Sequence, residues 1–184
     1  MAKVCVLLAE GFETVEALAV VDVLRRAGVE VKVASAMETL DVVSAQKVTV
    51  NCDCSFENVD YSDTDLLFLP GGMPGTTNLE KNEAIMAIVK KFAKDGKYIA
   101  AICAAPSILG HMGLLQGKKA IAFPSYEKEL TGAVVTRERV VVDGNIITSR
   151  GMGTAIDLGL KLVEILCDAQ KADKIAHGTC YIDD

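Results

Sequence analysis

The 184-residue chain lacks the charge pattern of a protein that binds nucleic acid or anionic membranes. Its formal net charge is −6, with 19 basic residues against 25 acidic ones, and it contains no basic cluster. Because phosphate backbones and anionic lipids attract positive charge, neither nucleic acid nor a membrane is expected as a partner. The apolar stretch before Glu10 is too short for a signal peptide or a membrane span, so a cytoplasmic protein is expected.

The six cysteines lack the spacing of a structural metal site or of a secreted disulfide framework. Cys52 and Cys54 are the one close pair, and neither a second C-x-x-C nor paired histidines accompany them. In a cytoplasmic protein they are expected to be reduced thiols that share one buried face of a strand. No metal is therefore predicted.

Histidine is scarce, and its two positions limit the mechanisms open to a catalytic cysteine. His111 lies eight residues after Cys103 in the same predicted helix, and His177 lies near the end of the sequence. Neither position brings an imidazole beside Cys103. The sequence therefore gives no support to a conventional Cys-His dyad.

Linkers, repeats and low-complexity segments are also lacking, so residues 1–184 are predicted to form one domain. Hydrophobic residues make up 51% of the chain, as expected where strands are covered on both faces. Strands are predicted at 4–9, 29–34, 65–69, 97–103, 120–123, 140–142 and 146–148, and helices at 14–27, 83–93, 105–112, 153–167 and 170–177.

This alternation of strands and helices indicates right-handed βαβ units. It predicts an α/β fold with one doubly wound, mostly parallel sheet and helices on both faces. Residues 39–59 are predicted to form a small β excursion with a hairpin. In the helix over 153–167, Ile156, Leu160 and Val163 are expected to point inward.

Cys103 stands at an abrupt change from strand to helix. The apolar run ends at the cysteine, and small residues and Pro106 follow at once, which suits the first turn of a helix. Ala101 and Ala105 fit the small-x-nucleophile-x-small pattern of a nucleophile elbow. A helix N-terminus beneath the sulfur would favour thiolate over thiol. Cys103 is therefore predicted to be a nucleophile, with a small apolar core residue as the alternative.

Three predicted strands bring different groups to their carboxyl ends, where ligands bind in open α/β sheets. The first strand leads into the helix that holds Glu16, the third buried strand ends in Gly71-Gly72, and the strand after Lys97 ends at Cys103. A buried Glu16 would be protonated and donate a hydrogen bond to the thiolate, which raises the Glu16 pKa and lowers the Cys103 pKa. Alternatively, Glu16 is an acid favoured in a first helical turn by the helix dipole.

Backbone amides near Cys103 are candidates for an anion pocket. The N–H groups of Gly71 and Gly72, together with that of Ala104, are suited to an oxyanion or to the oxygens of an oxidised cysteine. The glycines are otherwise simple turn formers. Arg150 is an accessory candidate, because the segment 150–154 also follows a strand and opens a helix. That segment is half a dinucleotide fingerprint, and no nicotinamide cofactor is predicted.

Four segments, taken together, resemble the ThiJ/PfpI superfamily: AEGFETVEA at 9–17, LPGG at 69–72, AAICAAP at 100–106 and TSRGMGT at 148–154. Within it the chain resembles the branch of the Parkinsonism-associated protein deglycase, in order and over nearly its whole length. The resemblance implies a flavodoxin-like homodimer without a cofactor. It also implies that Cys103 is an oxidation-sensitive nucleophile, Glu16 its hydrogen-bond partner, and the amides of Gly72 and Ala104 its anion pocket.

Several activities are implied by this resemblance. They include conversion of methylglyoxal to lactate, of the glyoxalase III type, deglycation of methylglyoxal-modified side chains, and a redox-regulated stress-chaperone role without turnover. A cysteine peptidase or amidase is a further alternative, which is weakened because Ala104 replaces the histidine that follows the nucleophile in the superfamily's intracellular peptidases. Phe123-Pro124 stands where the deglycase branch often has His-Pro, which leaves Glu16 as the proton carrier.

Overall fold

A seven-stranded sheet forms the middle of the computed structural model, which describes residues 1–182. The strand order is β10-β11-β7-β6-β1-β2-β5, and every neighbouring pair is parallel except β10 and β11. The strands are β1 (Lys3–Leu8), β2 (Glu30–Ser35), β5 (Cys54–Ser55), β6 (Leu66–Leu69), β7 (Tyr98–Ile102), β10 (Val140–Asp143) and β11 (Ile146–Ser149). The prediction of a mostly parallel sheet is confirmed.

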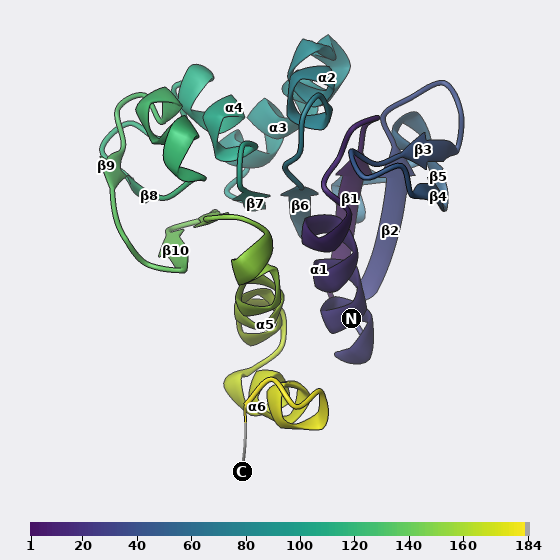
Figure 1. Ribbon diagram of the computed structural model, residues 1–184, viewed down its shortest axis with the longest axis vertical. Coiled ribbons are helices and arrows are strands. Elements are labelled where there is room, and N and C mark those ends of the chain that lie inside the picture. The colour runs from purple at the N-terminus through teal and green to yellow at the C-terminus, as the bar shows by residue number, and fades with distance from the viewer. Residues whose placement is uncertain (183–184) are drawn as a thin grey trace.

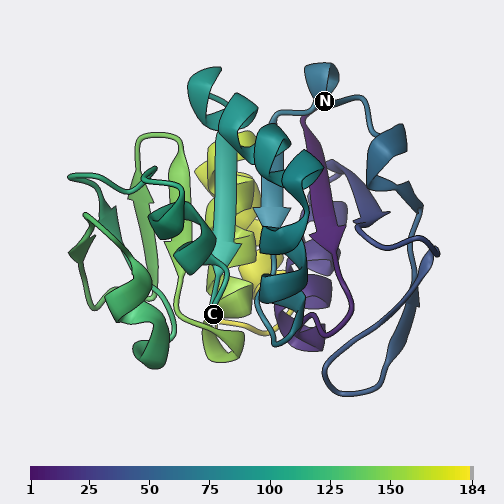
Figure 2. The same cartoon turned by 90° about the horizontal axis from the view of Figure 1, so that it is seen from above.

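Helices cover both faces of the sheet and enclose two hydrophobic cores (Figure 1). One core lies under α1 (Thr14–Arg26), α5 (Ala155–Leu166) and α6 (Ala169–Gly178). The other lies under α2 (Gly75–Lys81), α3 (Glu83–Lys94) and α4 (Pro106–His111). The view from above shows the strands side by side between these layers (Figure 2). Because both faces are buried, the central strands read as continuous apolar runs.

Helix α1 is defined by signals at both of its ends. The Glu13 carboxylate accepts a hydrogen bond from the Glu16 N–H at 2.7 Å, which caps one of the free amides of the first turn. Arg25 and Arg26 lie in the last turn, where positive charge complements the helix dipole. Gly28 follows with φ 75°, a left-handed conformation that glycine adopts without strain.

Helix α5 presents a different face to the core from the one predicted. Ile156 is 39% exposed and Leu160 is half-buried, whereas Val163 is buried as expected. The buried residues of α5 are Ala155, Leu158, Gly159, Leu162 and Val163. The reason is the contact with α1: Gly159 lies so close to Val23 that a Cβ there would be 3.0 Å from the Val23 Cβ. Because the two helices approach closely, α5 turns the face with Ala155 and Gly159 towards α1. The spacing of apolar residues alone does not predict this orientation.

The excursion over 39–59 is more divided than predicted. Strands β3 (Asp41–Val43) and β4 (Thr49–Asn51) form the expected hairpin, whereas β5 joins the edge of the main sheet beside β2. Asp53 separates β4 from β5, and its carboxylate accepts a hydrogen bond from the Val33 N–H. Cys52 therefore packs in one core and Cys54 against the other, so the prediction of a shared face is wrong.

Helix α2 has no counterpart in the sequence-based prediction, since it buries only Gly75, Thr76 and Leu79 and shows no apolar repeat. The remaining elements are short. A second small sheet pairs β8 (Lys119–Ala120) with β9 (Val134–Val135). Four 3-10 segments are η1 (Phe56–Asn58), η2 (Tyr61–Asp63), η3 (Pro124–Glu129) and η4 (Met152–Thr154). Within residues 1–182, no helix has both the length and the apolar character needed to cross a membrane.

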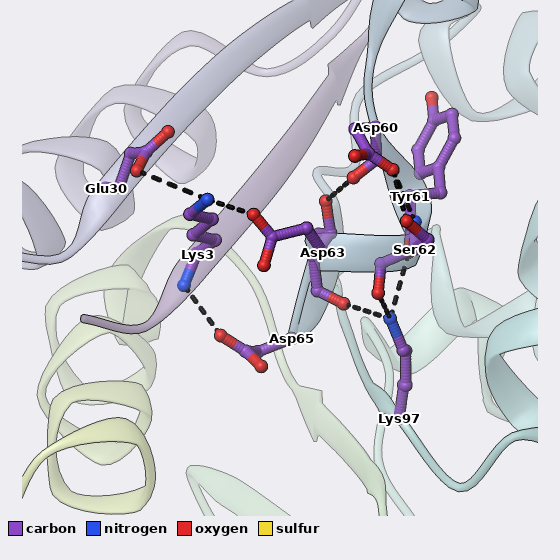
Figure 3. A network of polar contacts seen from close by, with 9 residues as sticks. Lys3, Glu30, Asp60, Tyr61, Ser62, Asp63, Asp65 and Lys97 are labelled. Atoms are coloured by element: carbon purple, nitrogen blue, oxygen red, sulfur yellow. Dashed lines mark hydrogen bonds and ion pairs between the residues drawn. The ribbon is translucent and has the colours of Figure 1, made fainter.

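A polar network joins the amino ends of the strands, away from the carboxyl ends that carry the candidate site (Figure 3). The Lys97 ammonium donates to the backbone carbonyls of Tyr61, Ser62 and Thr64 at 2.9, 2.7 and 2.8 Å. Lys3 forms ion pairs with Asp63 and Glu30. These contacts fix the η2 turn against β1 and β7, so this end of the sheet is structural.

Candidate functional site

Cys103 occupies the predicted elbow between β7 and α4. Its φ is 65°, a left-handed conformation that is uncommon outside glycine and typical of a nucleophile elbow. The Cys103 N–H donates to the Ser149 carbonyl at 3.0 Å, and its carbonyl accepts from the Phe123 N–H at 2.9 Å. Both backbone groups are thus held by neighbouring segments, while the thiol side chain stays partly exposed.

Glu16 lies beside this thiol although it is only 1% exposed. Its Oε2 accepts a hydrogen bond from the Gly71 N–H at 3.0 Å, and the Met152 N–H and the Cys103 thiol also face the carboxyl group. A buried carboxyl group with partners on three sides is held in one orientation. The first turn of α1, the end of β6 and the end of β7 therefore meet at one place, as predicted.

Position 71 requires glycine because there is no room for a side chain, and not because of its backbone conformation. A Cβ at this position would lie 2.6 Å from both the Cys103 Cβ and the Glu16 Oε2. Its N–H is already bonded to Glu16, so Gly71 does not serve the anion pocket as predicted. The amides that face the sulfur are those of Gly72 and Ala104.

Burial raises the pKa of both side chains, and their contact raises that of Cys103 while it lowers that of Glu16. The pKa of Glu16 is raised to about 7, chiefly by burial and in part by nearby Glu13, while the hydrogen bonds from Cys103, Gly71 and Met152 act in the opposite direction. Burial and the Glu16 carboxylate raise the pKa of Cys103 to about 12, against the lowering effect of the Ala104 and Gly72 amides. Both groups therefore bind their protons more tightly in the folded protein than they would in water.

The prediction of a depressed Cys103 pKa is wrong, and burial of the thiol is the largest cause of the raised pKa. Helix α4 is only six residues long and begins at Pro106, so its dipole is small and starts three residues beyond the sulfur. The carboxylate beside the thiol outweighs the two amides that favour thiolate. The structure therefore does not show the preformed thiolate with Glu16 as its donor that the sequence predicts.

The histidines lie elsewhere, as the sequence indicated. His111 places its two ring nitrogens 2.6 Å from Glu80 and 3.2 Å from Glu129, and His177 contacts the Asp173 carbonyl at 3.0 Å. No group of three or more His, Cys, Asp or Glu side chains in the described part of the chain is arranged to hold a metal ion.

Arg150 is exposed and lies at the margin of the site. With Phe123, Pro124, Met152 and neighbouring residues it lines a surface pocket of about 390 Å³. Gly151 connects this pocket with the reactive pair, since a Cβ there would lie 3.9 Å from the Cys103 Sγ and 3.8 Å from the Glu16 Oε1. The structure thus places Arg150 beside the site without bringing it to Cys103 or Glu16.

Gly151 and Met152 are site residues that were not predicted as such. The segment 150–154 had been recognised as a strand-to-helix turn able to bind anions, but what its Met152 amide faces is a carboxyl group of the protein itself. Phe123, which the resemblance puts at the position of an assisting histidine, lies beside the site and is held by the hydrogen bond from its N–H to the Cys103 carbonyl. The position of these residues depends on β11 lying next to β7, which the sequence did not specify.

Comparison with known proteins places this geometry in a family. The model of the DJ-1/PfpI family matches residues 2–165. The chain is 38% identical to DJ-1 homolog B of Arabidopsis thaliana over 178 residues, which is 96% of this chain and 41% of that protein. It is 37% identical to dj-1beta of Drosophila melanogaster, with 94% of both chains covered. It is also 38% identical to a protein named as a deglycase from Thermococcus kodakarensis, covering 82% of this chain and 91% of that one.

Solved structures agree with these sequence relatives. Oxidized DJ-1 of Toxoplasma gondii superposes with a TM-score of 0.95 at 39% identity, and the C103A mutant of a DJ-1 superfamily protein from Salmonella typhimurium with 0.94 at 34%. Both matches cover the full length of both chains. The chain spans less than half the length of the Arabidopsis relatives, at 41% and 44%. On the family match and on these identities, the chain belongs to the DJ-1/PfpI family.

Proposed function

We propose that this DJ-1/PfpI protein is a cysteine-dependent enzyme of the glyoxalase or deglycase type. Its substrates would be methylglyoxal, related small α-oxoaldehydes, or the adducts that these form with protein side chains. The observation that carries the proposal is the contact of Cys103 with a buried Glu16 whose pKa lies near 7. A general acid-base works best when its pKa is close to the operating pH, and burial brings this carboxyl group there.

The first step is addition of Cys103 to the aldehyde carbon. Glu16 takes the thiol proton as the C–S bond forms, and the carbonyl electron pair moves to oxygen. The amides of Gly72 and Ala104 face the sulfur and are suited to stabilise that oxygen charge. Return of the proton from Glu16 gives a neutral hemithioacetal.

The second step moves a proton between the two substrate carbons. Glu16 removes the C1 proton and passes it to the C2 oxygen, which gives an enediol. It then takes the proton of the C1 hydroxyl and delivers a proton to carbon C2, so C1 is oxidised while C2 is reduced and no external redox partner is needed. Collapse gives a thioester of lactate on Cys103. Water then cleaves the C–S bond, releases lactate and restores the thiol.

Lactate formation from methylglyoxal tests this proposal directly. The wild type, Cys103→Ala and Glu16→Gln should be assayed across pH 5 to 9. We expect no turnover in the first variant and a loss of about 10²–10⁴-fold in the second, since general acid-base catalysis contributes that much. The wild-type rate should rise with an apparent pKa near 7. Equal lactate production by all three proteins would refute the enzymatic assignment.

A redox sensor or stress chaperone is the second candidate, favoured by the two amides that face the sulfur. Oxidation by hydrogen peroxide would convert the thiol first to sulfenate and then to sulfinate, whose oxygens these amides could hold. Cys167 and Cys180 are exposed, whereas Cys103 is only partly so. Selective addition of two oxygens at Cys103, measured by peptide mass spectrometry, would therefore reflect chemistry rather than access.

The proposal includes a homodimer acting in the cytoplasm. Exposed apolar side chains lie close to the site, with Val15 next to Glu16 in the first turn of α1 and Met152 in η4. A peptidase or amidase is not proposed, because neither histidine contacts Cys103 in the described residues and Ala104 follows the nucleophile.

A further inference from the structure

The loop over 150–153 lies against the reactive pair, since a Cβ at Gly151 would be 3.8 Å from the Glu16 Oε1 and 3.9 Å from the Cys103 Sγ. The Met152 amide of this loop faces Glu16, so the contacts that hold the loop also set the environment of the pair. Its first part is fixed by Thr154. The Thr154 hydroxyl accepts from the Gly151 N–H at 3.2 Å and donates to the Gly151 carbonyl at 2.9 Å. The same hydroxyl lies 2.7 Å from that of Ser149 at the end of β11.

The far end of the loop is held from outside the site by Arg139. One guanidinium nitrogen, Nη2, donates to the Gly153 carbonyl at 2.7 Å and to the Asp157 Oδ2 at 2.7 Å, and Nε donates to the Asp157 Oδ1 at 3.0 Å. The Arg139 carbonyl in turn accepts from the Ser149 hydroxyl at 2.8 Å. A paired, two-point contact of this kind restricts the guanidinium plane as well as its position.

Tyr181 completes the arrangement from the far end of the chain. Its hydroxyl donates to the Asp157 Oδ1 at 2.6 Å, although 24 residues separate the two. The Asp157 side chain is 21% exposed and accepts from both partners, which lower its pKa against the opposing effect of burial. Segments from the strand edge, from α5 and from the stretch beyond α6 thus meet at one carboxylate.

We propose that Arg139, Asp157 and Tyr181 form a positioning clamp on the loop 150–153, and that this clamp holds the Met152 amide against Glu16. The three are positioning residues, because none of them touches Cys103 or Glu16. Through this clamp, the position of Tyr181, which follows α6, would affect the reactivity of Cys103 on the other side of β11. Displacement of Tyr181 would loosen the hold on Gly153 and move the Met152 amide away from the Glu16 carboxylate.

The direction of the effect follows from the groups around Glu16. It is faced by Cys103 from the end of β7, by Glu13 from the start of α1, and by the amides of Gly71 and Met152. Only the Met152 amide is carried by the clamped loop. Because that amide stabilises the ionised carboxylate, its withdrawal makes Glu16 a base only at higher pH, and deprotonation of Cys103 by Glu16 shifts with it.

The test measures the rate of Cys103 alkylation by iodoacetamide against pH, with each cysteine followed separately by peptide mass spectrometry. Asp157→Asn removes the charge that Arg139 and Tyr181 share, and Tyr181→Phe removes only one hydrogen bond. Glu164→Gln is the matched control, since it breaks the exposed Lys161–Glu164 pair on the same helix without touching the loop. We expect the midpoint of the alkylation profile to rise by about half a pH unit in Asp157→Asn, less in Tyr181→Phe, and not at all in Glu164→Gln.

Unchanged midpoints in both clamp variants would overturn the proposal, and so would an equal shift in the control. Combining Asp157→Asn with Tyr181→Phe should add nothing to the shift of Asp157→Asn alone, because both act through one carboxylate. The clamp proposal rests on the proposed function only for its importance to catalysis, because alkylation of Cys103 needs no turnover. The alkylation profiles would therefore test the clamp even if the protein had no glyoxalase activity.

Discussion

At the scale of single residues, the site depends on one carboxyl group kept out of water. Glu16 is only 1% exposed. The titratable groups beside it are Cys103, which hydrogen-bonds to its carboxyl group, and Glu13, whose negative charge repels that of an ionised Glu16. Ionising such a group costs free energy that the amides of Gly71 and Met152 only partly return. The carboxyl group beside the Cys103 thiol therefore lowers the stability of the fold when it ionises.

This cost makes folding stability depend on pH in a defined direction. The Glu16 pKa rises from 4.5 to about 7 on folding, so the native state binds the proton more tightly than the unfolded chain does. Stability from this group is therefore complete below about pH 4.5 and is lost as the pH rises through 7, by about 3 kcal/mol. In urea unfolding at pH 5 and pH 8, Glu16→Gln should lose less stability than the wild type over that interval. If the two proteins change in parallel, Glu16 is not strained by ionisation.

Gly71 offers a second test at this scale. In Gly71→Ala the new methyl group would overlap the Cys103 Cβ and the Glu16 Oε2, both 2.6 Å away, and neither can retreat within the packed site. We expect a loss of about 1–3 kcal/mol in unfolding free energy and loss of Cys103 reactivity towards iodoacetamide. Gly178→Ala, where a Cβ meets nothing within 4 Å, is the control and should keep both properties. Full reactivity in Gly71→Ala would show that the close approach is not needed.

At the scale of elements, the contact between α1 and α5 connects the first turn of α1, which holds Glu16, with the loop that precedes α5. Gly159 lies against Val23, and a Cβ at Gly159 would be 3.0–3.3 Å from three atoms of that side chain. Since α5 begins directly after η4, any displacement of α5 is transmitted to Met152. The spacing of these two helices is thus part of the geometry of the site.

Substitution of Gly159 should separate the two helices. Gly159→Val adds branched bulk where even a methyl group is tight, and we expect a loss of about 1–3 kcal/mol in unfolding free energy. The midpoint of Cys103 alkylation should move upward with it, as the Met152 amide withdraws from Glu16. Lys161→Ala on the same helix should change the unfolding free energy by no more than about 0.5 kcal/mol and should leave the midpoint of Cys103 alkylation unchanged. A stable Gly159→Val protein with the wild-type profile would contradict this coupling.

The same elements show what a sequence can and cannot predict. The elbow at Cys103 and the end of β6 at Gly71 were predictable because buried parallel strands are long apolar runs that stop abruptly. Helix α2 was missed because it buries too few apolar side chains to show a period. The inward face of α5 was misassigned because Gly159 and Val23 meet across two helices, and no local pattern encodes that meeting. Likewise, the sign of the Cys103 pKa shift depends on the balance between burial, one carboxylate and two amides, which only their geometry determines.

At the scale of the whole molecule, the proposed homodimer rests on the apolar side chains left exposed beside the site. Val15 is 44% exposed in the first turn of α1, and Val48, which precedes β4, is exposed to the same extent. The Thr14 hydroxyl of α1 donates a hydrogen bond to the Ser44 hydroxyl, which lies between β3 and β4. Exposed apolar side chains that cluster on one face mark an interaction surface. We propose that the pairing surface of the homodimer includes this end of α1.

Light scattering on the purified protein tests this assignment. We expect a particle of twice the 19.6 kDa chain mass. Val15→Glu should shift the protein towards monomer, because an interface cannot readily bury an unpaired carboxylate. Val134→Glu, at an exposed strand of the small second sheet, should leave the mass unchanged. A monomeric wild type, or a dimer indifferent to Val15→Glu, would show that pairing does not use this face.

The place of β7 between β11 and β6 also decides how long the site survives. Strands with partners on both sides exchange their amide hydrogens only when the molecule opens globally, whereas edges and loops exchange through small local openings. The Cys103 amide extends the β7–β11 ladder through its bond to Ser149, so it should be among the slowest amides to exchange with deuterated water. The residue with a positive φ at the elbow therefore lies in the part of the fold that is expected to open last, so the elbow should keep its backbone conformation until the whole domain unfolds.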